Sequence, residues 1–139
     1  MASGHGDLKT AALLTEEERE KSVVITDPGL PDNPMIFISD EFTKQTGYTP
    51  AEALGRNCRF LQGPDSDPEA IEAIRAALRS NSAITIDILN YTKSGESFWN
   101  RLRIRPLFGE DGRLLYFAGA QNPIRPDEVR SGPIADIRE

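Results

Sequence analysis

The chain contains one cysteine, Cys58, in a short segment that is bracketed by glycines and closed by a proline, Gly55–Pro64. Glycine and proline interrupt regular structure, so this segment is predicted to form one short helical turn. The thiol is accompanied there by the polar side chains of Asn57, Arg59 and Gln62, and by one phenylalanine and one leucine. A packing helix would carry more apolar residues, and a solvated helix would not mix them with charges. The mixture favours the wall of a pocket that holds a flat, partly polar molecule beside a thiol.

A single free cysteine is most often a small buried hydrophobic residue, and the segment alone leaves that interpretation of Cys58 open. One cysteine excludes an intrachain disulfide and a metal cluster built from several cysteines. The one histidine, His5, lies in the polar, glycine-containing start of the chain. A Cys-His hydrolase pair and a histidine metal site are therefore not expected, and we predict that no metal is bound.

Three strand-like segments follow one another later in the chain, at residues 83–91, 97–106 and 113–122. Side chains alternate between the two faces of a strand, and in each segment the mainly apolar face also carries one carboxamide, namely Asn90, Asn100 and Gln121. Burying an amide without a partner costs roughly 1 to 3 kcal/mol, so each amide must be hydrogen-bonded. The three amides bond one another or loop backbone, or they bond a buried heteroaromatic ring. Because the three amides lie on adjacent strands, we favour the ring as their shared partner. A carboxamide offers both donors and acceptors, which suits a ring that carries carbonyl and N–H groups.

The opposite face of these strands is too apolar to be simply solvated. It carries Asp87, Leu89, Tyr91, Trp99, Arg101, Arg103, Leu114, Tyr116, Ala118 and Ala120. We expect a helix from the start of the chain or a partner subunit to cover it.

The elements that position these residues alternate between short strands and short helices. Strands are predicted at 22–26 and 35–38, and helices at 40–46, from residue 49 and from residue 67 to about residue 79. Two strands, several helices and a three-stranded meander predict an α+β domain. Its five-stranded antiparallel sheet is expected to have helices packed on one face.

Length and charge narrow the class of protein. A chain of 139 residues suits one domain, and a net charge of -6 without a basic block disfavours nucleic acid as a partner. No apolar run approaches the ~20 residues that cross a bilayer, and no signal peptide is evident, so a cytoplasmic location is expected. We do not expect an enzyme, because the sequence lacks a dinucleotide fingerprint and an acid-base pair beside the pocket.

We divide the chain into an N-terminal extension (1–21), one domain (22–123) and a C-terminal tail without an effector domain (124–139). The first six residues are expected to be disordered. A cap helix is expected over 7–21, because apolar residues recur at helical spacing and Thr15 opens a capping box. Three prolines after residue 122 disfavour a long terminal helix.

The segment Gly55–Pro64 resembles the signature of LOV (light-oxygen-voltage) domains, the blue-light-sensing branch of the PAS fold found in phototropins and bacterial photoreceptors. The similarity covers about residues 23–122. It includes the shorter matches Ile25–Pro28, Asp32–Pro34, Ile88–Tyr91, Ser97–Asn100 and Gln121. In size the chain is similar to the short bacterial LOV proteins. The resemblance implies a PAS fold around a flavin pocket.

The resemblance also implies a function. The chain would be a blue-light photoreceptor that binds FMN noncovalently in the dark, with riboflavin or FAD as minor occupants. Cys58 would be the photoactive thiol that adds reversibly to flavin carbon C4a on illumination. Gln121 would be the amide that passes the signal to the sheet, the termini or a dimer interface. A homodimer through the N-terminal helix or the outer sheet face is expected, and the downstream partner stays open.

The resemblance assigns the other flavin contacts by their matching positions. Asn90 and Asn100 would hold the pyrimidine edge of the ring, and Arg59 and Arg75 the phosphate. The further contacts that it implies are Val24, Thr26, Asn33, Asn57, Leu61, Gln62, Leu78, Leu102, Ile104, Phe117 and Gly119.

The sequence departs from the family pattern in a few places. Leu102 stands where many members carry phenylalanine, which changes the packing against the ring. Met35 stands where a branched aliphatic residue is common, and our hypothesis is that its flexibility speeds dark reversion. The prolines near the end of the chain disfavour the amphipathic C-terminal helix through which plant LOV domains signal.

Three other functions are compatible with parts of the pattern. The main alternative is a PAS domain that binds flavin without a light response and senses redox state or a ligand. A flavoenzyme is the least favoured, because no substrate domain is evident. An interaction domain is compatible with the light-sensing hypothesis, since a dimer could change its geometry on illumination.

Overall fold

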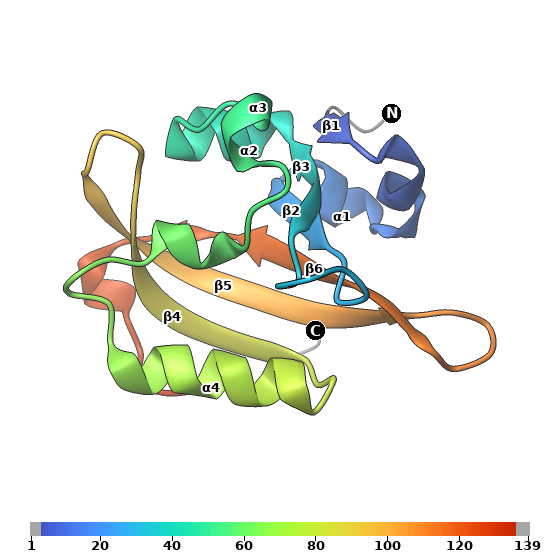
Figure 1. Cartoon of the computed structure of the whole chain (residues 1–139). Coiled ribbons are helices and arrows are strands. Elements are labelled where there is room, and N and C mark those ends of the chain that lie inside the picture. The colour runs from blue at the N-terminus through green and yellow to red at the C-terminus, as the bar shows by residue number, and fades with distance from the viewer. Residues whose placement is uncertain (1–3, 136–139) are drawn as a thin grey trace.

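The computed structural model describes residues 4–135. Its centre is one antiparallel sheet of seven strands in the order β1-β3-β2-β6-β5-β4, with β7 paired to β5 (Figure 1). The strands are β1 (Gly4–Gly6), β2 (Ser22–Thr26), β3 (Met35–Ser39), β4 (Ile84–Tyr91), β5 (Ser97–Phe108), β6 (Leu114–Gln121) and β7 (Pro123–Ile124). The α+β class predicted from the sequence is confirmed. The predicted number of five strands is wrong, because β1 and β7 join the sheet.

The helices begin where the sequence places capping residues. They are α2 (Asp40–Thr46), α3 (Pro50–Ala53), the 3₁₀ helix η2 (Cys58–Leu61) and α4 (Pro68–Arg79). The Ser39 side chain accepts from the Phe42 N–H at the start of α2, and Asp67 caps α4 in the same way. Helix α2 ends at Gly47, whose φ of 83° is in the left-handed region that glycine adopts readily. The helices predicted at 40–46, from residue 49 and from residue 67 are therefore present.

These four helices pack on the inner face of the sheet. Helix α4 lies along β4, while α2 and α3 gather beside β2 and β3 (Figure 1). The helices thus leave the middle of the inner face to the side chains of β4, β5 and β6. Within residues 4–135, no helix has the length and apolarity that crossing a bilayer requires.

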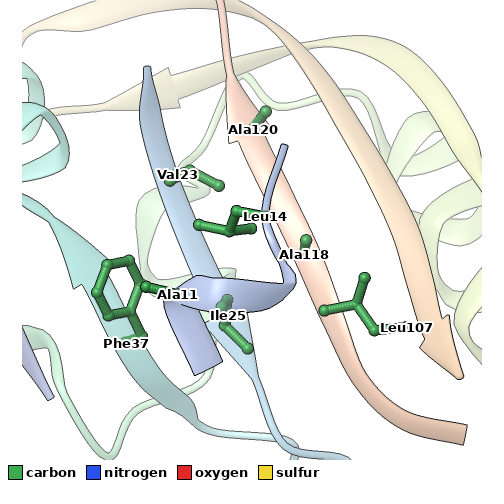
Figure 2. Packing of buried hydrophobic residues seen from close by; sticks show 8 residues of the cluster. All are labelled: Ala11, Leu14, Val23, Ile25, Phe37, Leu107, Ala118 and Ala120. Atoms are coloured by element: carbon green, nitrogen blue, oxygen red, sulfur yellow. The ribbon is translucent and has the colours of Figure 1, made fainter. Parts of the chain in front are cut away.

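The N-terminal segment covers part of the outer sheet face. In Figure 2, Ala11 and Leu14 lie against the outward side chains of the sheet, namely Val23, Ile25, Phe37, Leu107, Ala118 and Ala120. An ion pair adds a polar anchor: Arg105 donates to Glu18 from Nε at 2.8 Å and from Nη2 at 2.7 Å. The expectation that the start of the chain packs on this face agrees with the structure.

That segment is not one continuous helix. It consists of a 3₁₀ helix, η1 (Leu8–Leu13), and one turn of α-helix, α1 (Glu16–Arg19). Between them Leu14 and Thr15 are extended, with ψ of 150° and 164°. The expected helix over 7–21 is therefore wrong, because the capping box of Thr15 and Glu18 starts a new helix instead of continuing one.

The start of the chain also differs from the prediction of disorder. Residues Gly4–Gly6 form β1 and pair with β3, so the expected disorder is wrong for them. A side chain at Gly4 would collide with the Ile38 carbonyl oxygen at 2.5 Å, so the glycine permits this close pairing. The remaining part of that prediction, residues 1–3, lies outside the described residues.

The end of the chain crosses the outer face of β4 and β5. The Asp87 side chain has 0% exposure there and accepts from Arg101 Nε at 2.8 Å and Nη2 at 2.9 Å. The backbone N–H of Arg130 donates to the same carboxylate at 2.9 Å, and Arg101 donates to the Glu128 carbonyl at 3.0 Å. Beyond β7, the described part of this tail has one 3₁₀ turn, η3 (Pro126–Glu128), and no long helix, as the prolines predict.

Replacing Arg101 with methionine is expected to lower the free energy of unfolding at pH 7 by about 3 kcal/mol, because it leaves a buried carboxylate without its cation. Burial acts to raise the pKa of Asp87, but the hydrogen bonds and charge of Arg101, with the Arg130 N–H, hold this pKa below its ordinary value. In the wild type the pair therefore stabilises the fold above the unfolded pKa of about 3.9 and loses this effect as pH falls through the folded pKa.

In the Arg101→Met variant the pKa of Asp87 is expected to rise, so protonation relieves the buried charge in acid. Urea unfolding should then show a smaller difference from the wild type at about pH 4 than at pH 7. The double variant Asp87→Leu/Arg101→Met, which buries no charge, is expected to recover most of the loss. A double variant that is as unstable as the single one at pH 7 would contradict this account.

Candidate functional site

A cavity lies between the inner sheet face and the helices η2 and α4. It encloses about 910 Å³, part of which is open to solvent. Every site residue that the sequence analysis named lines this cavity, with the single exception of Asn100. Three further residues line the cavity that were not predicted as site residues, namely Ile71, Ile74 and Ile88. Their signals were present, since two belong to the apolar stripe of α4 and one shares a strand face with Asn90.

The three carboxamides of β4, β5 and β6 meet at one point of the inner face. Asn100 has 0% exposure and donates from Nδ2 to Asn90 Oδ1 at 3.0 Å and to Gln121 Oε1. It lies behind the cavity wall, whereas Asn90 and Gln121 form part of that wall. The amides therefore bond one another, and two of them also face the cavity, where a ring could lie.

The two cavity-lining amides keep hydrogen-bonding capacity. Asn90 Nδ2 donates to the Leu89 carbonyl at 3.3 Å, and Gln121 Nε2 donates to the Gly119 carbonyl at 3.5 Å, both long bonds. A carboxamide has two N–H donors and two acceptor lone pairs, so each side chain can also bond a ring edge. The amides thus suit a ligand that presents alternating carbonyl and N–H groups.

The thiol of Cys58 occupies the opposite wall, at the start of η2. Asn57 precedes it and accepts from the Arg59 N–H at 3.0 Å, which begins the 3₁₀ turn. Cys58 packs beside a buried cluster that includes Met35, which is 1% exposed. Burial raises the pKa of the Cys58 thiol to about 12, against a smaller opposing effect of a backbone hydrogen bond. The sulfur is therefore a neutral thiol at physiological pH.

Alkylation provides a direct check on this neutral thiol. Raising the pKa from 9.0 to about 12 lowers the thiolate fraction near pH 8 by roughly a thousandfold, and higher thiolate nucleophilicity restores roughly a factor of thirty. Iodoacetamide should therefore label folded protein at least roughly thirtyfold more slowly than the urea-unfolded chain. Because Cys58 is the only cysteine, Cys58→Ser serves as the blank. Labelling at equal rates in both states would show an ordinary exposed thiol.

Two features of the wall indicate room for a ligand. Asn33 Oδ1 is buried and has no hydrogen-bond partner among the described residues, although Asn33 lines the cavity. A buried acceptor without a partner is unfavourable, so a donor on a ligand would satisfy it. A Cβ added at Gly119 would lie 3.5 Å from Val24, an ordinary contact, so packing alone does not require glycine there. Glycine instead lets a flat molecule approach the backbone.

Two arginines stand at the mouth of the cavity. The side chains of Arg59 and Arg75 line it and are 54% and 62% exposed. Arg59 pairs with Asp32, and Arg75 approaches Glu72 at 3.9 Å. Asn57 Nδ2 donates to the Asp32 carbonyl at 2.8 Å. The loop that contains Asp32 is therefore bonded both to the residue before η2 and, through the Asp32 carboxylate, to Arg59. Two guanidinium groups at an open mouth can bind an anionic group.

The chain is similar in sequence to proteins of one family. The family model described as "PAS domain" matches residues 20–124. Phototropin-2 of Oryza sativa subsp. japonica is 52% identical over 107 residues, which is 77% of this chain and 12% of that protein. A blue-light-activated histidine kinase of Rhizobium johnstonii is 47% identical over 115 residues, which is 83% of this chain and 33% of the kinase. The chain thus spans a third or less of these two curated relatives.

Among solved structures, the chain resembles LOV domains. A light-oxygen-voltage domain studied with a flavin analogue is 40% identical, with a TM-score of 0.78 and 87% of each chain covered. The LOV domain of a blue-light-activated histidine kinase from Erythrobacter litoralis is 39% identical, with a TM-score of 0.72, and the match covers 75% of this chain and 95% of that domain. These likenesses agree with the cavity, the thiol and the amides described above. The chain therefore belongs to the PAS family and, within it, to the LOV domains.

Proposed function

We propose that this chain is a blue-light sensor that binds FMN noncovalently in the dark and bonds it reversibly through Cys58 on illumination. One observation carries the proposal: a half-buried, neutral thiol stands in the wall of a cavity that faces a cluster of carboxamides. The relatives named above support it, since they are blue-light proteins and LOV domains.

The residues of the cavity fit a flavin mononucleotide. The ring edge of a flavin alternates carbonyl and N–H groups, which matches the free capacity of Asn90 and Gln121. The unpartnered Asn33 Oδ1 can accept from a polar group of the ligand. Arg59 and Arg75 stand at the open mouth, where the phosphate would lie. Riboflavin and FAD share the ring. The two arginines favour a flavin that carries phosphate over riboflavin, and we propose FMN as the main occupant.

The ligand and the protein would each contribute part of the chemistry of this site. The bound flavin supplies light absorption and an electrophilic carbon, C4a. Cys58 would supply the thiol: its sulfur would bond that carbon and its proton would pass to ring nitrogen N5, so no oxidant or base would be consumed. Gln121, which lines the cavity, would then present its carboxamide oxygen to the new N–H instead of its N–H₂ group. Asn100 holds Gln121, so this reorientation reaches the hydrogen-bond network of β5 and β6.

The proposal is tested by an absorption spectrum of the purified protein before and after a blue flash. We expect a flavin band that bleaches and then recovers in the dark. A flavin band that does not respond to light would favour the alternative, a light-independent PAS domain that senses redox state or a ligand. A protein that neither contains nor takes up flavin would contradict both functions.

Removal of one arginine at the cavity mouth is expected to weaken the binding of FMN but not that of riboflavin. The Arg75→Gln variant should bind FMN about ten- to a hundredfold more weakly, because a hydrogen bond to a charged group contributes about 1.5 to 3 kcal/mol. Riboflavin lacks the phosphate, so its affinity should change by less than about threefold. Titration followed by flavin fluorescence gives both constants. Equal weakening of both flavins would show that Arg75 acts on the fold and not on the phosphate.

We propose a sensor module and not an enzyme, with residues 22–123 as its light-sensing domain. The flanking segments would carry the signal, because both lie on the outer sheet face in the described structure. We also propose a homodimer, since Leu8 and Leu13 of the N-terminal segment are 59% and 42% exposed beside that face. Light scattering coupled to size exclusion, in the dark and under blue light, measures this directly, and a single monomer mass in both would reject it.

A further inference from the structure

The segment between η2 and α4 forms the rim of the cavity mouth. Residues 62–67 join η2, which carries Cys58 and Arg59, to α4, which carries Arg75. Both helices line the cavity, so a contact that holds the segment between them can restrain their separation. The following inference rests on the flavin-binding function proposed above, and it concerns residues that lie outside the cavity wall.

Ser66 ties this segment to β4. It is 5% exposed, and its Oγ accepts from the Gly63 N–H at 3.0 Å and donates to the Leu89 carbonyl. The Ser66 N–H in turn donates to the Gly63 carbonyl at 3.0 Å, which closes the turn. One buried hydroxyl therefore hydrogen-bonds both a backbone N–H of the turn and a backbone carbonyl of β4.

Tyr91 provides a second attachment to the same strand. Its hydroxyl oxygen accepts from the Asp65 N–H at 3.0 Å. Its ring packs so closely on the segment that a Cβ added at Gly63 would lie 2.3 Å from Tyr91 Cε1. Gly63 is therefore required for close approach, and any side chain there would push the rim away from β4.

The two attachments flank a residue of the binding wall. Leu89 and Tyr91 hold the rim, while Asn90 between them lines the cavity, because side chains alternate along the strand. One short stretch of β4 thus positions both the amide that faces the ring and the rim that closes over the ligand. Neither Ser66 nor Tyr91 is among the described residues that line the cavity, so both act through the rim.

We propose that Ser66 and Tyr91 are positioning residues that fasten the rim to β4 and thereby limit the rate at which flavin leaves the site. Release through the mouth requires η2 and α4 to separate, and the segment that joins them cannot move outward while both attachments hold. Breaking either attachment lowers the barrier to this movement, while the contacts between the ligand and the cavity wall stay in place.

The test measures FMN release in the dark after a large dilution, followed by flavin fluorescence anisotropy. Ser66→Ala is expected to release FMN about tenfold faster, because it leaves the Gly63 N–H without its buried partner. Tyr91→Phe keeps the ring and loses only the hydroxyl, and Asp65 is exposed to water, so release about threefold faster is expected. Tyr116→Phe on the outer face serves as the matched control and should change release by less than about twofold.

A second measurement separates positioning from general stability. In Ser66→Ala and Tyr91→Phe the amide proton of Asp65 should exchange faster, and the lost hydrogen bond should lower the free energy of unfolding of the flavin-free protein by about 1 kcal/mol. Arg101→Met lowers stability on the outer face without touching the rim, so as a control it should release FMN at close to the wild-type rate. If wild-type protein binds FMN and the Ser66 and Tyr91 variants release it at the wild-type rate, the inference is overturned and the proposed function stands. If Arg101→Met releases FMN as fast as Ser66→Ala does, then faster release follows from any loss of global stability, and the inference is also overturned. Failure of the wild type to bind FMN would overturn the proposed function itself.

Discussion

Cys58→Ala is expected to bind FMN and to show no bleaching after a blue flash. The chain has no other cysteine, so no second thiol can replace the one in the cavity wall. Loss of a small neutral group should change flavin affinity by less than about fivefold, because it costs roughly 1 kcal/mol. The absorption band before and after illumination, with flavin fluorescence as a second signal, measures binding and light response in one sample.

Cys58→Ser is the matched control for this prediction. It keeps a group of similar size that can donate a hydrogen bond, but its hydroxyl is a far weaker nucleophile than a thiol. Loss of bleaching in both variants would therefore assign the light response to the sulfur and not to the shape of the wall. Reversible bleaching that persists without the sulfur would place the photochemistry elsewhere and reject the assigned role of Cys58.

Asn100→Ala is expected to lower the free energy of unfolding of the flavin-free protein by about 3 kcal/mol, since an unsatisfied buried group costs roughly 1 to 3 kcal/mol. Asn100 is fully buried, donates to Asn90 and Gln121, and accepts from the Asn122 N–H at 2.9 Å. Removing its amide leaves these groups to find new partners. It also frees the two cavity-lining amides to rotate, so FMN binding should weaken at least about tenfold.

Asn81→Gly provides the matched control, because it also deletes one carboxamide. Asn81 is exposed at the end of α4 with φ of 54°, a conformation that glycine adopts more readily. The free energy of unfolding of the Asn81→Gly variant should therefore stay within about 0.5 kcal/mol of the wild type. Urea unfolding with and without FMN measures both effects. An Asn100→Ala protein that is as stable as the control would mean that the amide cluster is not a structural part of the sheet.

Local patterns were sufficient to predict most of the elements. Capping residues and glycine stops placed the helices, because helix ends must satisfy their own N–H and C=O groups within a few residues. Alternation placed three carboxamides on one sheet face, because the period of a strand is two residues. The failures lie toward the two ends of the chain, at residues 4–21 and at β7. The pairing of Gly4–Gly6 with β3 depends on a strand about thirty residues away and has no local signal.

Sequence by itself determined the chemistry available to this protein: a single thiol, a run of amides on one face, two arginines and the family to which the chain is similar. Only the tertiary structure decided how these groups are used. It placed Asn90 and Gln121 in the cavity wall, with Asn100 bonded to both. It also paired Arg59 with Asp32 and bonded Ser66 to the Leu89 carbonyl of β4. The physical reason is that these contacts join residues distant in the chain, so they depend on strand register and loop path and not on the residues beside them.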